Sequence, residues 1–255
     1  MKKVGLVLSG GGIRGIAHLG LLQALDELQL KPHAISGTSA GAIIGALYAE
    51  GISPQKILEL GKANLSFGFT SIALRSGGLF SIDNIHKALL ENLPHDSFEE
   101  LKIPLYVNAT DLYANKTTYF SKGKLVACLE ASASVPLIFS PADVENKKYV
   151  DGGLLNNFPV EPLLAICDKI VGCHVNPLQE YDEAQAKLSR FALMERCYHM
   201  SIASTVYSKT ELCDLFIEPP LSTFGMFDTK KSDQIFTLGY EAAINKKEKL
   251  LSLWN

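Results

Sequence analysis

The hydrophobic pattern of the first fifty residues predicts two short buried strands, each followed by a helix. Val4–Leu8 is an unbroken apolar run of strand length, and Ala34-Ile35 is a shorter one. Between them, leucine and isoleucine recur at helical spacing from Arg14 to about Leu30. A second helix is expected from Ser39 to Glu50, ended by Gly51. This region therefore reads as strand, helix, strand, helix.

The remainder of the chain continues this alternation. Further strands are expected at 103–109, 117–120, 148–150, 169–175 and 215–218, and further helices from Ser53-Pro54 onward, at 184–209 and at 232–251. Residues 64–81 hold aromatic and aliphatic side chains among glycines and serines without a period, which we interpret as a mobile loop or lid. Alternating strands and helices predict an α/β fold whose mostly parallel sheet is covered on both faces.

Composition narrows the class of protein. The chain has 255 residues, 47% of them hydrophobic, so a single domain over residues 1–255 is expected. A net charge of −3 with scattered basic residues argues against nucleic acid as a partner. The apolar run after Met1 is too short for a signal peptide, and polar residues interrupt 34–52, so no membrane span is expected. Five cysteines without a CxxC pair argue against a zinc site and favour reduced thiols in the cytoplasm.

Two glycine-rich turns follow the first two strands. They read GGGIRG at 10–15 and GTSAG at 37–41. If the strands are parallel neighbours, a right-handed crossover places both turns at the same carboxyl edge of the sheet. Two helix amino termini then point at one place, which suits an anion. That anion is either a bound phosphate or an oxyanion formed during a reaction.

The first turn resembles a nucleotide-binding loop only in part. Gly10-x-Gly12-x-x-Gly15 has dinucleotide spacing, but the second strand ends in Ile35-Ser36-Gly37 without the carboxylate that would hold a ribose. A Walker loop is excluded because Ile16 and Ala17 stand where Lys and Ser/Thr belong. A nucleotide- or phosphate-binding module is therefore the alternative function, not the first.

The second turn carries a reactive atom. Ser39 lies between Gly37 and Gly41, the G-x-S-x-G spacing of a nucleophile elbow, and small residues follow it. The backbone amides of Gly10, Gly11 and Gly12 are then candidates for an oxyanion hole. For Arg14 two interpretations stay open: it orients that loop or assists with charge, or it is a solvated cation at a helix start.

The serine needs a base, and Asp151 is the best candidate. It ends the strand at 148–150, and Gly152-Gly153 allows a tight turn toward the serine. Its carboxyl group would need burial to raise its pKa. Asp111 is a rival at another strand end but lacks the double glycine. The histidines are interpreted as structural: His174 lies in an apolar strand, and His199 and His18 lie in helices.

Three ordered motifs together resemble the patatin-like phospholipase family. They are GGGIRGIAHLG at 10–20, GTSAG at 37–41 and DGGLLNNFP at 151–159, and the segments ASASVP at 131–136 and GYEAA at 239–243 resemble further recurrent parts of that family. The resemblance implies a three-layer α/β/α sandwich. It also implies lipid acyl ester hydrolysis by a Ser39–Asp151 dyad, with the Gly10–Gly12 amides as oxyanion hole and without metal or cofactor.

The partner expected from this resemblance is a lipid or another acyl ester. Two segments, residues 64–81 and 222–227, are candidates to line a hydrophobic cleft or to touch a membrane surface peripherally. Core packing explains such side chains equally well. A non-catalytic lipid-binding protein that keeps the fold is a further alternative. The presence of both Ser39 and Asp151 speaks against it.

Overall fold

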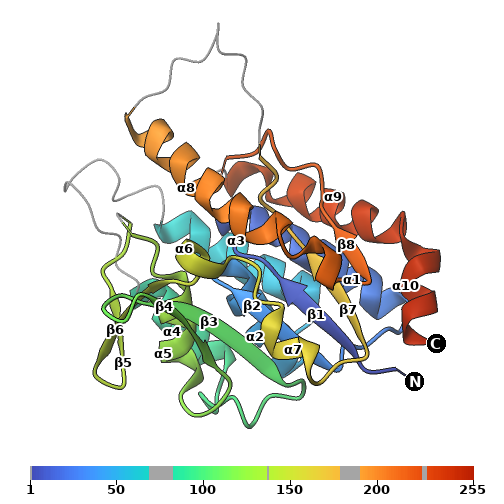
Figure 1. The fold of residues 1–255 in the computed structure, drawn as a ribbon, viewed down its shortest axis with the longest axis horizontal. Coiled ribbons are helices and arrows are strands. Elements are labelled where there is room, and N and C mark those ends of the chain that lie inside the picture. The colour runs from blue at the N-terminus through green and yellow to red at the C-terminus, as the bar shows by residue number, and fades with distance from the viewer. Residues whose placement is uncertain (1, 69–82, 137, 179–189, 226–228) are drawn as a thin grey trace, which may run out of the picture.

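The computed structural model describes residues 2–68, 83–136, 138–178, 190–225 and 229–255, and strands from these segments form one eight-stranded sheet (Figure 1). The strands are β1 (Val4–Leu8), β2 (Ala34–Thr38), β3 (Leu105–Asp111), β4 (Lys116–Phe120), β5 (Ala142–Val144), β6 (Lys147–Asp151), β7 (Lys169–Cys173) and β8 (Leu215–Ile217). Hydrogen-bonded neighbours follow the order β5-β6-β3-β2-β1-β7-β8, and β4 also pairs with β3. The five strands from β3 to β8 along this path are parallel, whereas β4, β5 and β6 join antiparallel.

Helices occupy most of the connections. They are α1 (Ile16–Glu27), α2 (Ala40–Glu50), α3 (Pro54–Gly68), α4 (Asp83–Asn92), α5 (Leu125–Ala133), α6 (Gly153–Asn156), α7 (Glu161–Leu164), α8 (Arg190–Tyr207), α9 (Ser232–Ile244) and α10 (Lys247–Trp254), with 3-10 turns η1 (Gly12–Gly15), η2 (Thr210–Leu212) and η3 (Thr229–Lys231). None of the described helices combines the length and the apolar character that crossing a bilayer requires.

Two hydrophobic cores lie on opposite faces of the sheet. Along β1, Leu6 and Leu8 belong to the larger core, whereas Val7 between them belongs to the smaller one, as alternation in a strand requires. The larger core is formed with α1, α2, α5 and α9. The smaller core contains Phe158 and residues of α7 and α8. The chain therefore has the predicted three layers, helices on both faces of a mostly parallel sheet.

The pairing of β3 explains how two distant turns meet. β4 pairs with Val107 to Asp111 along one edge of β3. Along the other edge, Asn108 pairs with Thr38 at the end of β2, and the next residue, Ala109, pairs with Asp151 at the end of β6. β2 and β6 run in opposite directions, so their carboxyl ends face each other. The residue after Thr38 is Ser39.

Most predicted elements are present, with some corrections at their ends. The helix expected at 232–251 is two helices, because the chain turns at Asn245-Lys246 so that Leu250 and Trp254 of α10 reach the larger core. Residues 64–68, expected as irregular, extend α3, since no proline interrupts the helix begun at Pro54. Residues 69–81 of the expected lid, and 184–189 of the expected long helix, lie outside the described residues. The elements α4, α5, α6, α7 and β5 were not predicted.

Candidate active site

Ser39 sits in a strained turn between β2 and α2. Its φ of 53° and ψ of −121° are unusual for a residue with a side chain. The turn is tight, because a Cβ on Gly37 would lie 2.7 Å from the carbonyl carbon of Gly41, and one on Gly41 would lie 2.4 Å from the Leu8 carbonyl oxygen. Side chains at positions 37 and 41 would collide with backbone. The sharp strand-to-helix turn therefore has the geometry of a nucleophile elbow.

The Asp151 carboxyl group is buried and contacts the serine. Its residue is only 2% exposed. The carboxylate accepts hydrogen bonds from the Gly153 amide at 2.6 Å and from the Tyr198 hydroxyl at 3.3 Å, and the neighbouring Ser39 hydroxyl also lowers the pKa of this carboxyl group. Burial raises the pKa of Asp151 to about 6, and the neighbouring Ser39, Gly153 and Tyr198 oppose that rise. Asp151 is therefore a stronger base than an exposed aspartate and is still ionised near neutral pH.

The glycines after Asp151 fit the close contacts of this turn. A Cβ on Gly152 would lie 2.4 Å from the Asn108 carbonyl oxygen. One on Gly153 would lie 2.8 Å from Oδ1 of Asp151 and 2.7 Å from Oδ1 of Asn157. The double glycine thus lets the chain fold back over its own carboxylate, so that the Gly153 amide can donate to it.

The first glycine turn lies directly against Ser39. A Cβ on Gly10 would lie 3.2 Å from the Ser39 Cβ. The Gly10 amide donates to the Asn157 carbonyl over a long 3.4 Å. The amides of Gly11 and Gly12 donate no hydrogen bond to any residue that the structure describes. An oxyanion hole requires backbone amides that are free to donate to the substrate.

Two asparagines fix the orientation of this turn. The Gly10 carbonyl oxygen accepts from Nδ2 of Asn157 at 3.2 Å and from Nδ2 of Asn176 at 3.0 Å. In a trans peptide the carbonyl of one residue and the amide of the next point in opposite directions. Anchoring the Gly10 carbonyl therefore also sets the direction of the Gly11 amide. Sequence analysis gave neither asparagine a role, although Asn157 lies in the DGGLLNNFP segment.

Arg14 is a buried part of the same loop. Only 5% of the residue is exposed. Its Nε donates to the Phe224 carbonyl at 2.7 Å, and one terminal nitrogen donates to Oδ1 of Asn176 at 3.2 Å. The interpretation as a solvated cation is therefore wrong, because the guanidinium is enclosed by the chain. The guanidinium joins the glycine turn to the segments that follow β7 and β8.

The carboxyl end of α5 holds both turns together. The Ser132 hydroxyl accepts from the Ser39 amide at 2.8 Å. The Ser134 carbonyl accepts from the Asp151 amide at 2.9 Å, and the Ser132 carbonyl accepts from the Gly152 amide at 3.2 Å. Sequence analysis noted ASASVP only as a recurrent segment and assigned no role to Ser132. Spacing along the chain gives no signal for these contacts, since they span about 20 to 90 residues.

The rival candidates lie elsewhere or have other hydrogen-bond partners. Oδ1 of Asp111 accepts from the amides of Tyr113 and Ala114 and so closes the β3–β4 turn. His18 and His174 are buried, each with Nε2 on a backbone carbonyl. Burial lowers the pKa of His18 to about 4 and that of His174 to about 3. For His199, burial and then the charges of Arg14 and Arg196 lower the pKa to about 4.

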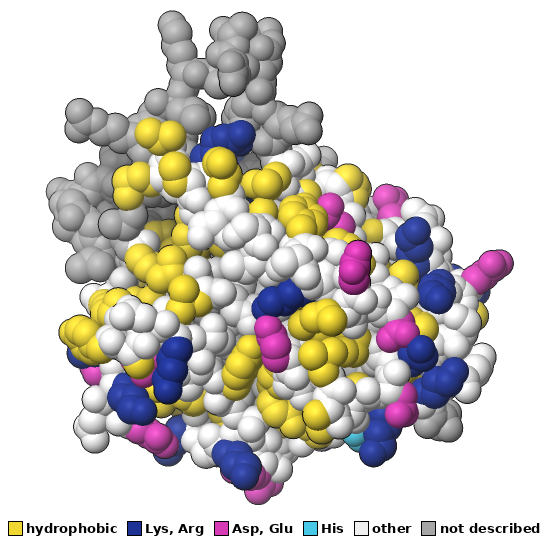
Figure 2. All heavy atoms as spheres, in the orientation of Figure 1, with side chains coloured by type: hydrophobic (Ala, Val, Ile, Leu, Met, Phe, Trp, Pro, Cys, Tyr) yellow, Lys and Arg dark blue, Asp and Glu magenta, His cyan; other side chains and the backbone are white. Residues whose placement is uncertain are grey.

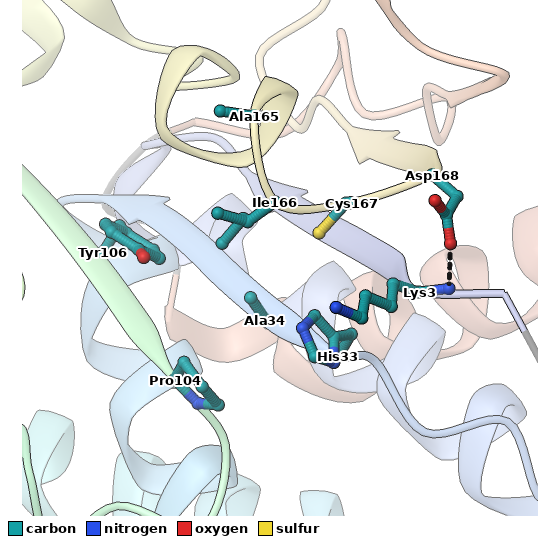
Figure 3. Close-up of a pocket in the computed structure, with 9 residues that line it drawn as sticks. All are labelled: Lys3, His33, Ala34, Pro104, Tyr106, Ala165, Ile166, Cys167 and Asp168. Carbon is teal, nitrogen blue, oxygen red and sulfur yellow. Dashed lines mark hydrogen bonds between the residues drawn. The ribbon is translucent and has the colours of Figure 1, made fainter.

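A separate cavity of about 540 Å³ opens at the opposite edge of the sheet (Figure 3). It lies where β2, β3 and β7 begin, and its polar lining residues are Lys3, His33, Tyr106, Cys167 and Asp168. The Lys3 amide donates to Oδ2 of Asp168 at 2.8 Å. Within the described residues, no group of three His, Cys, Asp or Glu side chains is arranged to hold a metal ion.

Comparison with known proteins identifies relatives of this chain. The chain is 27% identical to lysophospholipase nte1 of Aspergillus niger, over 98% of this chain and 18% of that one. It is 31% identical to an uncharacterized NTE family protein of Mycobacterium tuberculosis, over 64% of this chain and 46% of that one. The chain thus spans less than half the length of these relatives.

A solved structure shares the fold, and a family model matches more than half of the chain. The crystal structure of VipD from Legionella pneumophila superposes with a TM-score of 0.55 at 15% identity, covering 99% of this chain and 67% of that one. The model of the patatin-like phospholipase family matches residues 6–164, which include both glycine turns and Asp151. The chain is therefore a member of the patatin-like phospholipase family.

Proposed function

We propose that this chain is a serine acyl hydrolase that cleaves lipid acyl esters, with Ser39 as nucleophile and Asp151 as general base. The observation that carries the proposal is that the hydroxyl of the strained Ser39 neighbours the buried carboxylate of Asp151 and lowers its pKa. A carboxylate with a pKa of about 6 is poised to accept a hydroxyl proton at neutral pH. Membership of the patatin-like phospholipase family supports the same reaction.

The proposed reaction proceeds through an acyl-enzyme. Asp151 accepts the Ser39 proton as Oγ forms a bond to the acyl carbonyl carbon, and the carbonyl electron pair moves onto oxygen. The amides of Gly11 and Gly12, with that of Gly10, donate to this oxyanion. The oxyanion then collapses, and Asp151 returns the proton to the departing alcohol. Water, activated by Asp151, releases the fatty acid and restores Ser39.

The substrate we favour is a monoacyl phospholipid presented at a lipid surface. Several relatives are named lysophospholipases, which supports a lipid with a single acyl chain. Hydrophobic side chains gather over α8 in Figure 2, and Leu193, Met194 and Met200 of this helix are each about half exposed. Tyr198 of the same helix contacts Asp151. A membrane surface held by α8 would therefore lie close to the proposed dyad.

Turnover of defined esters tests this proposal. Wild-type protein should hydrolyse p-nitrophenyl butyrate and lysophosphatidylcholine, and Ser39→Ala should abolish both activities. His174→Gln and His199→Gln should keep most of the activity, because neither ring contributes to the proposed proton transfer. Loss of activity in a histidine variant with retention in Asp151→Asn would replace the dyad by a histidine-dependent mechanism. A non-catalytic lipid-binding protein would show no turnover that depends on Ser39.

A further inference from the structure

The Asp151 carboxylate has a donor from a part of the chain that the sequence motifs do not include. Oδ1 accepts from the Gly153 amide, two residues away, and from the Tyr198 hydroxyl at 3.3 Å. Tyr198 lies 47 residues farther along, in α8. The Tyr198 oxygen also lies only 3.2 Å from where a Cβ on Gly153 would be. The hydroxyl is therefore packed into the turn that carries the proposed base.

The placement of Tyr198 follows from the helical repeat of α8. Tyr198, Ile202 and Val206 are four residues apart and so lie on one face of the helix. Ile202 and Val206 are buried in the smaller core, and Tyr198 packs against that core. The opposite face carries the exposed Leu193 and Met200. The helix is thus anchored along the face that aims the phenol at Asp151.

We propose that Tyr198 is a positioning residue for the proposed base: its hydroxyl holds Oδ1 of Asp151 in place and stabilises the ionised carboxylate. This inference rests on the proposed function of Ser39 and Asp151. Burial alone favours the protonated, inactive acid, and a hydrogen-bond donor offsets that effect. Burial and the neighbouring carboxylate hold the pKa of Tyr198 well above its usual range, so the phenol remains a donor at all physiological pH values.

Other groups around Asp151 do not titrate in the same range. The segments packed against the acid present the non-titratable Asn108 and Thr110 from β3, and Ser132 and Ser134 from the end of α5. The turn before α6 presents the Gly153 amide. Helix α8 adds His199 beside Tyr198, and η1 adds Arg14, which also lowers the pKa of His199. The pKa of His199 is about 4, so an activity change near pH 6 would report on Asp151.

The test is the pH dependence of kcat/KM for p-nitrophenyl butyrate in Tyr198→Phe. Tyr207→Phe is the matched control, because Tyr207 lies on the same helix and its hydroxyl bonds Glu218 at 2.8 Å instead of the acid. For Tyr198→Phe we expect the acid limb to move up by about one pH unit, with about tenfold lower activity at pH 5 and little change above pH 8. Tyr207→Phe should leave the limb where it is.

Two outcomes separate the inference from the function on which it rests. An equal loss of activity at every pH, or an unmoved limb in an active Tyr198→Phe enzyme, overturns the role of Tyr198 alone. A wild-type protein without turnover contradicts the proposed function. Carbon-13 NMR of the Asp151 carboxyl group, assigned with Asp151→Asn, gives a second readout, the midpoint of the carboxyl titration. In a Ser39→Ala background, Tyr198→Phe should raise the midpoint of its titration, and an unchanged midpoint would contradict the inference.

Discussion

Two buried aspartates end neighbouring strands, yet their surroundings give them different roles. Asp111 ends β3 and Asp151 ends β6, and the two strands pair with each other. Both residues are at most 5% exposed. Asp111 directs one oxygen to the amides of its own turn, at Tyr113 and Ala114. Asp151 is shared among Ser39, Gly153 and Tyr198, which come from three different segments.

The difference shows that the register of strand pairing decides which of the two acids lies beside Ser39. Both acids end a strand, so that position alone does not distinguish them. Asp151 pairs with Ala109, one residue beyond the Asn108 that pairs with Thr38. Asp111 lies two residues farther along β3, past the end of β2. A strand advances about 3.3 Å per residue, so Asp111 is displaced by roughly 7 Å along the sheet. The backbone amides of its own turn donate to the Asp111 carboxylate instead.

The largest expected effect separates the two acids in catalysis. Asp151→Asn should lower the kcat of ester hydrolysis by about 10²–10⁴-fold, because the amide cannot accept the Ser39 proton. Asp111→Asn should retain activity within about twofold, since the amide oxygen still accepts from the turn amides and Asp111 takes no part in the proposed proton transfer. Steady-state kinetics at pH 8 on both variants checks this. Equal losses in the two would remove the distinction between these turns.

A glycine substitution extends the comparison to the proposed oxyanion hole. A Cβ on Gly11 would lie 2.4 Å from Cγ2 of Val175, so Gly11→Ala must displace the turn. We expect about 10²–10³-fold lower kcat, the loss typical of one oxyanion donor. Gly61→Ala is the control, because no described atom lies within 4 Å of its added Cβ. That variant should keep its activity and gain about 0.5–1 kcal/mol in unfolding free energy, since Gly61 lies within α3.

The smallest expected effects concern stability, and they have opposite signs for the two acids. The folded-state pKa of Asp151, about 6, lies above its ordinary value of 3.8. The stability that its protonated form contributes is fully present below pH 3.8 and is lost as pH rises through 6. Asp151→Asn, which does not titrate, should therefore gain up to about 3 kcal/mol at pH 8 and about half of that at pH 5.

Asp111→Ala should instead destabilise the protein. It removes the acceptor of two turn amides, which we expect to cost about 1–2 kcal/mol in unfolding free energy. Urea denaturation at pH 5 and pH 8 measures both variants. A stabilising Asp111→Ala, or an Asp151→Asn without a pH-dependent gain, would contradict the contrast between an acid that stabilises its turn and an acid whose ionised form is destabilised by burial.

The local sequence pattern predicted the strands and turns that bring Ser39 and the glycine amides to one edge of the sheet. The apolar runs at β1 and β2 and the glycine turns after them sufficed to place residues 10–12 and Ser39 together, because a crossover between parallel neighbours fixes the edge. The double glycine singled out Asp151 over Asp111 for a steric reason that the contacts of Gly152 and Gly153 match. These inferences depend on residues close together in sequence.

Long-range contacts were beyond sequence reasoning. The antiparallel β3–β6 pair, the Ser132 hydroxyl on the Ser39 amide and the Tyr198 hydroxyl on Asp151 depend on how segments far apart in the chain pack. The helical pattern of α8 could place Tyr198 on a buried face, but not opposite a particular carboxylate. Burial of Arg14 was missed for the same reason: its partners Asn176 and Phe224 lie more than 160 residues away.

The most direct test of the central claim is covalent trapping of the serine. A fluorophosphonate ester should add one phosphonyl group to the wild-type chain at Ser39, located by peptide mass mapping. Asp111→Asn should react at the wild-type rate, and Asp151→Asn at least about tenfold more slowly, since the serine then lacks its base. Labelling at another residue, or an equal rate in Asp151→Asn and the wild type, would contradict the account.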